Sequence, residues 1–503
     1  MHIAFVNIQG NFDPEDRYWT AHPDFGGQLV YVKEVCLALG RMGHKVDILT
    51  RRIRDADWPG FESDLDGYPG EPNVRIVRLP CGGDQFLDKQ DLWPYIATEW
   101  VPNIIDFYTR EGRQPDAATS HYGDAGLAAA VWRVDGGPPY TFTAHSLGAQ
   151  KLERMLADAG HHYSLEALDR EYHFARRIEG EREAMSRAAR IVTSTHQERE
   201  EQYAHPAYVG AINPADDRRF AVVPPGVSLK VFDAQHRCPQ EDRVVQHIEA
   251  NLARDIREGA RQRPVVVCSS RLEPKKNHLG LVQAFARNRA LRDAANLLLV
   301  VRGVDDLQDL SALKPHEHAL MEEIVAEVEA QGLLGHVSVV SLESQQELAA
   351  AYRHLRQRGS VFALTALYEP FGLAPLEAMA AGLPAVVTRY GGPSETLYDY
   401  EQGCECGVLV DATDPQAIAR GLLRLVGPAN EWRHFQRMGR QRVLERFTWE
   451  RTAEGYLATL QEILAQPQAP GLKGALPIHP YFRDPRPEND PLVAPLRKIF
   501  DVA

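Results

Sequence analysis

Short apolar runs alternate with amphipathic, helix-patterned stretches along most of this 503-residue chain, and the whole alternation occurs twice. Strands that are apolar along their length are buried on both faces, which is typical of a parallel sheet covered by helices. We therefore predict an α/β protein of two doubly wound, Rossmann-like domains. The runs expected to form strands are residues 4–7, 46–49, 74–78, 140–143 and 191–194, then 265–270, 297–302, 337–341, 361–365 and 384–388.

Prolines and one late helix pattern suggest the domain boundaries. The Pro-Pro-Gly-Val sequence at 224–227 reads as a hinge, which gives a first domain of residues 1–228 and a second of residues 229–448. A helix at 449–466 is expected to cross back to the first domain. Residues 467–503 carry eight prolines, which forbid a continuous helix, so we expect an extended proline-rich tail on the surface.

Composition narrows the class of protein. Hydrophobic residues make up 44% and charged residues 25%, as in an ordinary globular enzyme, and the net charge of −13 argues against a nucleic-acid or anionic-membrane binder. We expect no membrane span and no signal peptide. The six cysteines are scattered, so a reduced, cytoplasmic protein is expected, and no metal site is predicted at the Cys404-x-Cys406 pair.

Ligands of open α/β sheets bind beyond the carboxyl ends of the strands, and two such domains facing each other would form a deep cleft. The first candidate loop there is Asp-Phe-Gly-Gly-Gln at 24–28, which opens the first expected helix. Its glycines allow close backbone approach, and a helix N-terminus favours an anion. A simple tight turn explains it equally well. The dinucleotide fingerprint is absent, so a nicotinamide enzyme is not predicted.

The second loop is Thr-Ala-His-Ser-Leu-Gly-Ala at 143–149, between an expected strand and a helix. It is nearly the nucleophile elbow of the α/β-hydrolases, in which Ser146 would be the nucleophile. Alternatively, His145 contacts a sugar through a hydrogen bond. A capped helix start is the third interpretation.

Two further loops follow strands of the second domain. Arg271 and Lys276 lie five apart after the strand at 265–270, where together they can neutralise a leaving diphosphate. Glu369 and Glu377 lie eight apart after the strand at 361–365, around a Phe-Gly-Leu turn. One carboxylate can hold hydroxyls of a donor sugar and the other a ribose diol. A solvated basic loop and acidic helix capping are the simpler alternatives.

Together these residues resemble the retaining GT-B glycosyltransferases of family four over about residues 1–466. Glu369 and Glu377 match that family's Glu-x7-Glu motif, and Arg271 and Lys276 match its diphosphate-binding pair. Within the family, the segments at 9–13, 22–28, 141–151 and 368–377 are most similar to those of the sucrose-phosphate synthases.

The resemblance implies roles for individual residues. Those expected to act in catalysis are His145, Arg271, Lys276 and Glu369. Those expected to bind the donor are Gly27, Arg271, Lys276, Phe371, Gly372, Leu373 and Glu377. Those expected to bind the acceptor are Gly27, Gln28, Lys89, Ser146, Lys151, Arg176 and Arg177.

The implied reaction moves glucose from UDP-glucose to fructose 6-phosphate with retention of configuration. GDP-mannose as donor, as in mannosylfructose-phosphate synthases, and free fructose as acceptor, as in sucrose synthases, are the alternatives. A serine hydrolase using Ser146 is a remote one. We expect no cofactor and no metal. The Asp-x-Asp-x-Thr phosphatase motif is not found, so a separate sugar-phosphate phosphatase is expected to act on the product.

Overall fold

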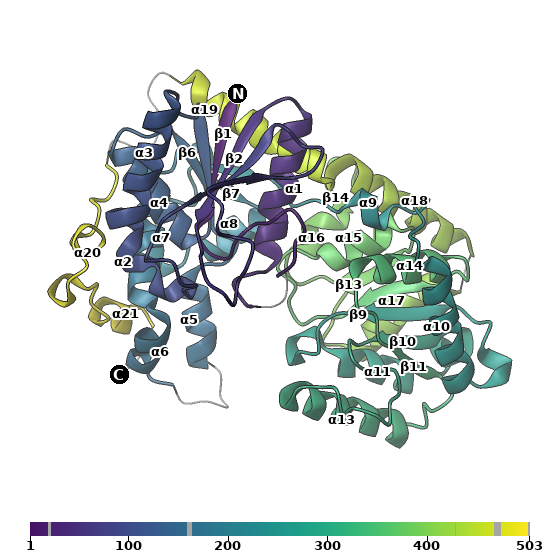
Figure 1. The fold of residues 1–503 in the computed structure, drawn as a ribbon. Helices are drawn as coiled ribbons and strands as arrows, with labels where there is room; N and C mark the ends of the chain where they lie inside the picture. Colours follow the sequence, from purple (N-terminus) through teal and green to yellow (C-terminus); the bar gives the residue numbers. More distant parts are fainter. Residues whose placement is uncertain (19–21, 158–162, 428, 467–473, 501–503) are drawn as a thin grey trace. The chain divides into compact units, whose positions relative to one another are not determined.

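The computed structural model describes residues 1–18, 22–157, 163–427, 429–466 and 474–500 (Figure 1). They belong to two compact units: unit 1 is Met1–Pro224 with Thr452–Ala503, and unit 2 is Pro225–Arg451. The division lies at Pro224, beside the predicted boundary at residue 228, and the chain passes back to unit 1 within α19 (Trp449–Ala465). Within the ranges described, no helix is both long enough and apolar enough to span a bilayer.

Unit 1 is built on an eight-stranded sheet with the order β3-β4-β2-β1-β5-β6-β7-β8, in which only β3 is antiparallel to its neighbour. The strands are β1 (His2–Val6), β2 (Lys45–Arg51), β3 (Leu65–Gly67), β4 (Val74–Leu79), β5 (Ala117–His121), β6 (Tyr140–Thr143), β7 (Arg190–Thr193) and β8 (Phe220–Val222). The main helices are α1 (Gly27–Arg41), α2 (Trp93–Tyr95), η2 (Ile96–Trp100), α3 (Val101–Glu111), α4 (Gly123–Val134), α5 (Gly148–Ala157), α6 (Leu165–Tyr172), α7 (Phe174–Arg187) and α8 (His196–Gln202).

Alternating side chains of the unit 1 strands face helices on both sides of the sheet. On β1, Ala4 and Val6 belong to the core shared with α3, α4 and α7, whereas Phe5 lies on the other face, 6.2 Å from the ring of Tyr456 in α19. A Cβ on Gly126 of α4 would lie 2.6 Å from Phe142 and 2.7 Å from Ala184, so only glycine lets the two helices pack this closely. The result is the three-layer arrangement that alternation in the sequence predicts.

Unit 2 has a six-stranded, fully parallel sheet with the order β11-β10-β9-β12-β13-β16. Its strands are β9 (Val265–Ser269), β10 (Asn296–Val300), β11 (Val337–Val340), β12 (Val361–Leu364), β13 (Ala385–Thr388) and β16 (Val408–Val410), beside the small hairpin β14 (Tyr398–Asp399) and β15 (Cys404–Glu405). Its helices are α9 (Leu229–Phe232), α10 (Glu241–Asp255), α11 (His278–Arg287), α12 (Arg289–Ala294), α13 (Pro315–Ala330), α14 (Gln345–Arg356), α15 (Leu373–Ala380), α16 (Pro393–Thr396), α17 (Pro415–Val426) and α18 (Ala429–Arg446).

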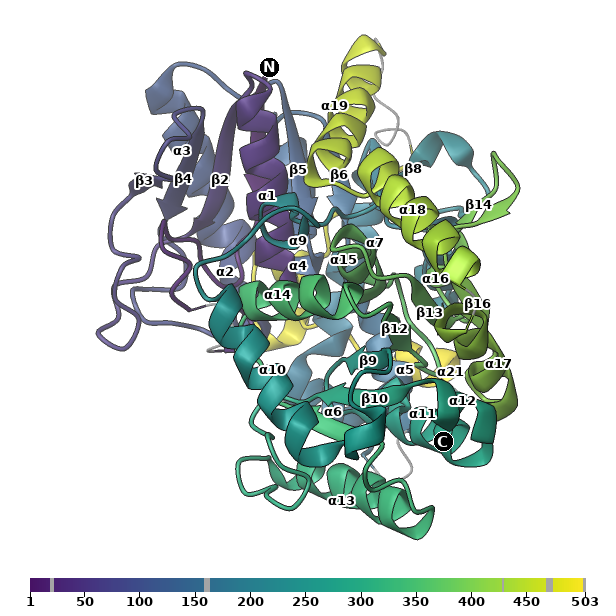
Figure 2. The same ribbon diagram turned by 90° about the vertical axis from the view of Figure 1, so that its right-hand side faces the viewer.

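The two faces of the unit 2 sheet carry separate cores. Val265 and Val267 pack with α10, α14 and α15, while Val266 and Cys268 pack with α11, α13 and α17. Figure 2 shows α10 and α14 apart from α11, α12 and α17, with β9 and β10 between them. Both units are therefore doubly wound, with the carboxyl ends of their strands free to carry functional loops.

The proline-rich segment is the main departure from the predicted fold. Its described part, residues 474–500, forms helical turns rather than an extended surface tail: α20 (Pro480–Arg483), η7 (Pro487–Asn489) and α21 (Ala494–Ile499). Two of these turns begin at a proline, whose missing N–H costs nothing at the first helical position. Tyr481 and Phe482 are buried in the unit 1 core and anchor the segment.

Candidate functional site

The strand order of the unit 1 sheet reverses between β1 and β5, and the first candidate loop follows β1. Gln28 donates a hydrogen bond from Nε2 to Asn7 Oδ1 at 2.6 Å and to the backbone oxygen of His121 at 3.1 Å. No atom lies within 4 Å of the place that a Cβ would take on Gly27, the first residue of α1. The free N–H groups and the dipole of this helix end therefore face open space, which suits an anion.

His145 lies in the turn after β6, in a left-handed backbone conformation with φ of 56°. Its Nε2 is 2.9 Å from Nδ1 of His121, whose other nitrogen is 3.1 Å from Thr119 Oγ1. Burial lowers the pKa of His145 to about 3 and holds that of His121 well below its usual value. Both imidazoles are neutral at physiological pH, so His145 can donate or accept a hydrogen bond but does not supply positive charge.

Ser146, next to it, lacks the surroundings of a hydrolase nucleophile. Its hydroxyl is 3.5 Å from Nη2 of Arg177, and its carbonyl accepts from the same nitrogen at 2.7 Å. No histidine in the described ranges makes a hydrogen bond to its hydroxyl, and a triad needs such a base. The loop therefore presents His145 rather than an activated serine.

Three of the predicted acceptor-binding cations line one open hollow of unit 1. Lys89, Lys151 and Arg177 line it together with aromatic side chains that include Tyr122 and Tyr172. The Lys151 ammonium lies 5.0 Å from the centroid of the Tyr172 ring. Burial, followed by repulsion from Arg177 and Lys89, lowers the pKa of Lys151 to about 8. Such a concentration of positive charge in a net acidic protein indicates an anion-binding site.

Arg177 is fixed in that hollow by buried hydrogen bonds. Its Nε donates to Glu181 Oε1 at 2.9 Å, and its guanidinium lies 4.5 Å from the centroid of the Tyr122 ring. Glu181, which is fully buried, also accepts from the Gly148 N–H at 3.0 Å and from the Tyr208 hydroxyl at 2.5 Å. One carboxylate thus ties the arginine to the start of α5.

Arg176 is separated from the other predicted acceptor residues. Its guanidinium makes two hydrogen bonds to Asp490, at 2.7 and 2.6 Å, and lies 4.6 Å from the centroid of the Tyr481 ring. It does not line the hollow. Consecutive residues of a helix do not face the same way, so Arg176 and Arg177 of α7 cannot both point into one site.

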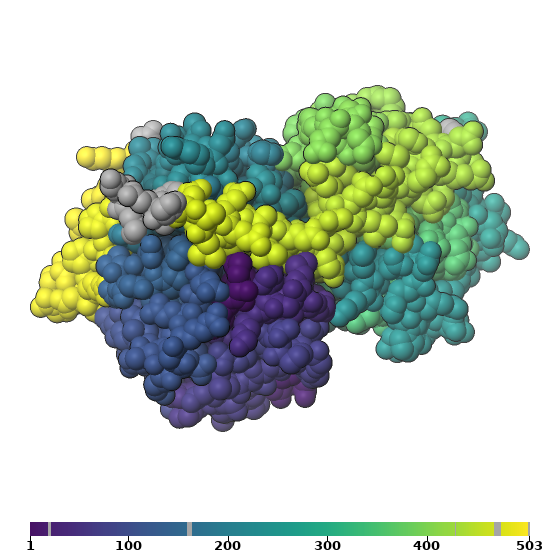
Figure 3. Space-filling view, turned by 90° about the horizontal axis from the view of Figure 1, so that it is seen from above, coloured from purple at the N-terminus to yellow at the C-terminus, as the bar shows by residue number. Residues whose placement is uncertain are grey.

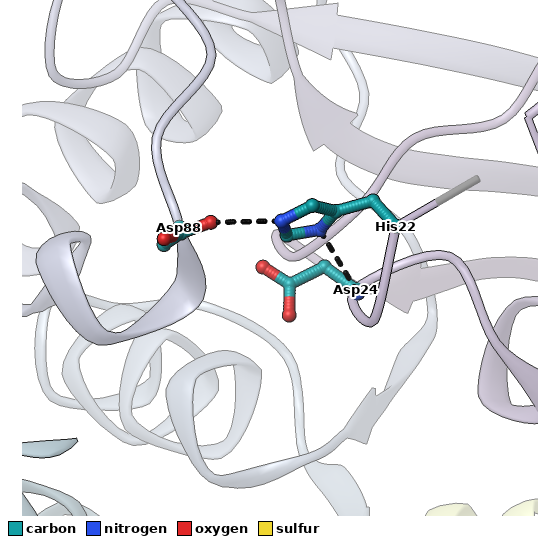
Figure 4. Close-up of side chains that lie close together, drawn as sticks. All are labelled: His22, Asp24 and Asp88. Atoms are coloured by element: carbon teal, nitrogen blue, oxygen red, sulfur yellow. Dashed lines mark hydrogen bonds and ion pairs between the residues drawn. The ribbon is translucent and has the colours of Figure 1, made fainter. Parts of the chain in front are cut away.

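His22, Asp24 and Asp88 form a group with metal-ligand chemistry, and their ligand atoms all lie within 4.8 Å of one another (Figure 4). His22 Nε2 is 3.1 Å from Asp88 Oδ1, and the Asp24 N–H donates to His22 Nδ1 at 3.2 Å. Asp24 accepts from the Lys89 N–H at 2.9 Å and is also paired with the Lys89 ammonium. The charge of Asp24 is thereby balanced, and the arrangement holds Lys89 at the edge of the hollow.

In unit 2 the strand order reverses between β9 and β12, and two of the predicted site residues, from the loops after these strands, are in contact. Lys276 Nζ donates to Glu369 Oε2 at 2.7 Å, and the side chains are only 14% and 13% exposed. Arg271 is not part of this contact: its side chain is 76% exposed and pairs with Glu273 at 2.7 Å. The Lys276–Glu369 pair is therefore preformed, whereas Arg271 is free to move towards a ligand.

The loop after β12 is held by glycines. Gly372, the residue before α15, has φ of +93°, and Leu373, the first residue of the helix, is 37% exposed. A Cβ on Gly391 would lie 2.1 Å from the Glu369 backbone oxygen, which accepts from the Gly392 N–H at 3.0 Å. The two-glycine turn after β13 therefore fixes the backbone that carries Glu369.

Phe371 and Glu377 flank the start of α15. The Phe371 ring packs 6.1 Å from that of Phe447. Glu377 is half-buried, and desolvation raises the pKa of its carboxyl to about 7. No hydrogen bond to this carboxyl is found within the described ranges, so it remains available to accept from hydroxyls of a ligand.

Several residues of these sites were not identified from the sequence. His121 orients His145, Glu181 holds Arg177, and Gly391 with Gly392 supports the loop of Glu369. The Gly-Gly-Pro sequence at 391–393, two residues after an expected strand, was a usable signal for the last of these. Nothing comparable in the sequence marks His121 or Glu181.

The two units thus carry complementary chemistry. Unit 1 combines an open helix N-terminus, a neutral histidine and three cations around one hollow. Unit 2 combines a buried Lys–Glu pair, an exposed arginine and a half-buried carboxyl. Cations and helix ends stabilise phosphate oxygens, and carboxylates hold sugar hydroxyls, so the arrangement suits phosphorylated carbohydrates.

Comparison with known families gives matches in both units. Residues 26–226 match the glycosyl transferase 4-like domain, and residues 253–442 match the family of glycosyl transferases group 1. A probable sucrose-phosphate synthase of Thermosipho melanesiensis is 41% identical over 92% of this chain and 97% of its own length. The sucrose-phosphate synthase of Zea mays is 31% identical over 91% of this chain, which spans only 47% of that longer protein.

Solved structures agree with this fold. The sucrose-phosphate synthase of Thermosynechococcus elongatus superimposes with a TM-score of 0.62 at 23% identity, covering 92% of this chain and 99% of that structure. HepE of Anabaena, solved in complex with UDP and glucose, gives a TM-score of 0.53 at 16% identity, covering 91% and 99% of the two chains. At these identities the structures support the fold alone.

Proposed function

The chain belongs to the sucrose-phosphate synthase family of GT-B glycosyltransferases, and we propose that it transfers glucose from UDP-glucose to fructose 6-phosphate with retention of configuration. The products are sucrose 6-phosphate and UDP. The observation that carries this proposal is the hollow in which Lys89, Lys151 and Arg177 converge. Three cations around one small space fit a dianionic phosphate, a group that free fructose does not carry.

The neutral parts of unit 1 suit the sugars. The open N-terminus of α1 at Gly27 and Gln28 offers N–H groups to the acceptor and the donor diphosphate. His145 is uncharged and oriented by His121, so it contacts a hydroxyl of the transferred glucose without competing for phosphate. Ser146 then serves the acceptor side through its position beside Arg177.

Unit 2 takes the donor. Lys276 and Arg271 neutralise the leaving diphosphate, Glu369 holds hydroxyls of glucose, and the backbone of 371–373 adds N–H groups at a helix start. Glu377 accepts hydrogen bonds from the ribose diol, which favour the ionised form of a carboxyl whose pKa is about 7 in the free protein.

In the transfer step the bond between C1 of glucose and the diphosphate oxygen breaks, and a bond from C1 to the anomeric oxygen of fructose forms. The incoming hydroxyl approaches the face from which the diphosphate departs and gives its proton to the departing phosphate oxygen. The cations stabilise the charge that builds on that oxygen. A separate phosphatase is the class of enzyme that would release free sucrose from the product.

A matrix of donors and acceptors tests this function. We expect kcat/KM to be highest for UDP-glucose with fructose 6-phosphate among UDP-glucose, ADP-glucose and GDP-mannose, each paired with fructose 6-phosphate and with fructose. A higher kcat/KM with GDP-mannose would show that GDP-mannose, not UDP-glucose, is the donor. Equal efficiency with free fructose would show that the cationic hollow does not bind an acceptor phosphate.

A further inference from the structure

The C-terminal segment, defined here as residues 476–500, packs on α2 and α7, two helices of unit 1 that contribute side chains to the acceptor hollow. It belongs to the same compact unit as the hollow, and α20 lies beside α2 and α7 in the ribbon (Figure 1). In the space-filling view its yellow atoms lie against blue atoms of the first half of unit 1 (Figure 3). Three groups of its contacts fall on α2 and α7.

The first contact supports one wall of the hollow. Trp93 lines the hollow and is almost fully buried, and behind it lies Phe482 of α20, with the two rings 6.2 Å apart. Phe482 itself is fully buried. Trp93 follows directly after the turn of Lys89 (η1, Lys89–Asp91), so displacement of Phe482 would loosen both residues.

The second contact is with α7, the helix that carries Arg177. Asp490 holds Arg176 through two hydrogen bonds, and the Tyr481 ring lies against the same guanidinium. Arg176 is the neighbour of Arg177 in α7, so the clamp fixes the rotation of the helix turn from which Arg177 enters the hollow.

The third contact anchors the other end of α7. The His479 N–H donates to Glu183 Oε1 at 2.6 Å, and the Leu476 N–H donates to Ser186 Oγ at 3.2 Å. Arg187 returns a hydrogen bond to the Leu476 carbonyl at 2.6 Å. The segment is thereby attached along the whole length of α7.

From these contacts we infer that the C-terminal segment is a brace that positions the phosphate-binding side chains of the acceptor hollow. Asp490 and Phe482 are positioning residues: they touch Arg176 and Trp93 rather than substrate. The inference rests on the proposed role of the hollow in binding the acceptor phosphate. It assigns a part in the reaction to a segment outside the glycosyltransferase resemblance.

A brace of this kind makes two equilibria depend on each other. If docking of the segment favours the arrangement that binds phosphate, bound phosphate favours docking by the same factor. Coupling between two such sites is typically about fivefold or more. A segment that only adds stability would show no such response to phosphate.

Asp490→Asn tests the clamp, because the amide keeps the shape but loses the charge that holds Arg176. Asp490→Glu is the conservative rescue. Arg483→Ala is the matched control on the same segment, since its side chain pairs with Asp135 at 2.8 Å, outside the hollow. For each full-length protein the dissociation constants of inorganic phosphate, fructose 6-phosphate and UDP are measured by calorimetry, with KM and kcat alongside.

We expect Asp490→Asn to raise the dissociation constants of inorganic phosphate and fructose 6-phosphate by about fivefold or more, with that of UDP unchanged. The other two variants should stay near wild type. In the wild-type protein, inorganic phosphate should slow amide hydrogen exchange at His479. The brace is refuted if Asp490→Asn binds phosphate as tightly as wild type, or if phosphate does not change the amide hydrogen exchange at His479. Loss of phosphate affinity in a protein that does not glycosylate fructose 6-phosphate would support the brace and refute the proposed function.

Discussion

The lowered pKa of Lys151 predicts how acceptor binding depends on pH. In the free protein the ammonium has a pKa of about 8, because burial and the neighbouring Arg177 and Lys89 disfavour its charge. A phosphate dianion favours the charged form, so the bound protein keeps its proton at higher pH. Below pH 8 both states carry the proton and affinity is constant. Above pH 8 binding must take up a proton, and affinity falls.

The size of the effect follows from the titration. The charged fraction of a group of pKa 8 falls from about 0.9 at pH 7 to about 0.1 at pH 9, so KM for fructose 6-phosphate should rise roughly tenfold. The phosphate itself does not change charge in this range, since its second pKa is about 6. KM is measured at saturating UDP-glucose from pH 6.5 to 9.5.

Lys151→Arg is the control for this prediction. A guanidinium stays protonated throughout the range, so the variant should show a KM that no longer rises between pH 7 and pH 9. Lys151→Met should have a high KM at every pH. A flat profile in the wild type, or the same rise in Lys151→Arg, would refute the assignment of Lys151 to the acceptor phosphate.

Three other substitutions test the remaining parts of the site. Lys276→Ala should lower kcat by about 10²–10³ in a protein that still folds, and activity within a few-fold of wild type would remove Lys276 from the diphosphate site. His145→Ala should be far more damaging than Ser146→Ala, and stoichiometric labelling of Ser146 by a fluorophosphonate would revive a hydrolase. Because the carboxyl of Glu377 has a pKa of about 7, KM for the donor should fall between pH 6 and pH 8, whereas Glu377→Gln should show no such change.

The longer apolar runs marked ten strands, whereas the short β8 and β16 and the less apolar β5 were not predicted. All ten expected strands are present, but β5 was overlooked because its sequence is Ala-Ala-Thr-Ser-His. It lies in the middle of the sheet, between β1 and β6, and is buried on both faces. Small side chains there make room for α4. Because they do not form an apolar run, neither the strand nor His121 at its end could be identified from the sequence.

The acceptor residues show a second limit of sequence reasoning. Matching a phosphate-binding set does not reveal which of two adjacent arginines faces the ligand. Successive residues of a helix point about 100° apart, so only Arg177 faces the hollow. Arg176 instead binds Asp490, which lies far along the chain.

The proline-rich segment shows a third limit. Proline density correctly excludes a long helix, yet it does not imply an extended chain, because prolines also begin short helical turns. Tyr481 and Phe482 next to Pro480 were the signal that this segment docks on a core. A pair of aromatic residues is costly to leave in water, so it usually finds a partner surface.

The most direct test of the whole account is the identity and configuration of the product. UDP-glucose, labelled with ¹³C at C1, is incubated with fructose 6-phosphate and the purified protein, and the product is followed by NMR. The account predicts UDP and sucrose 6-phosphate, with the label in an α-glucosidic bond. A β-linked product, labelled free glucose as the main product, or no transfer to fructose 6-phosphate would contradict it.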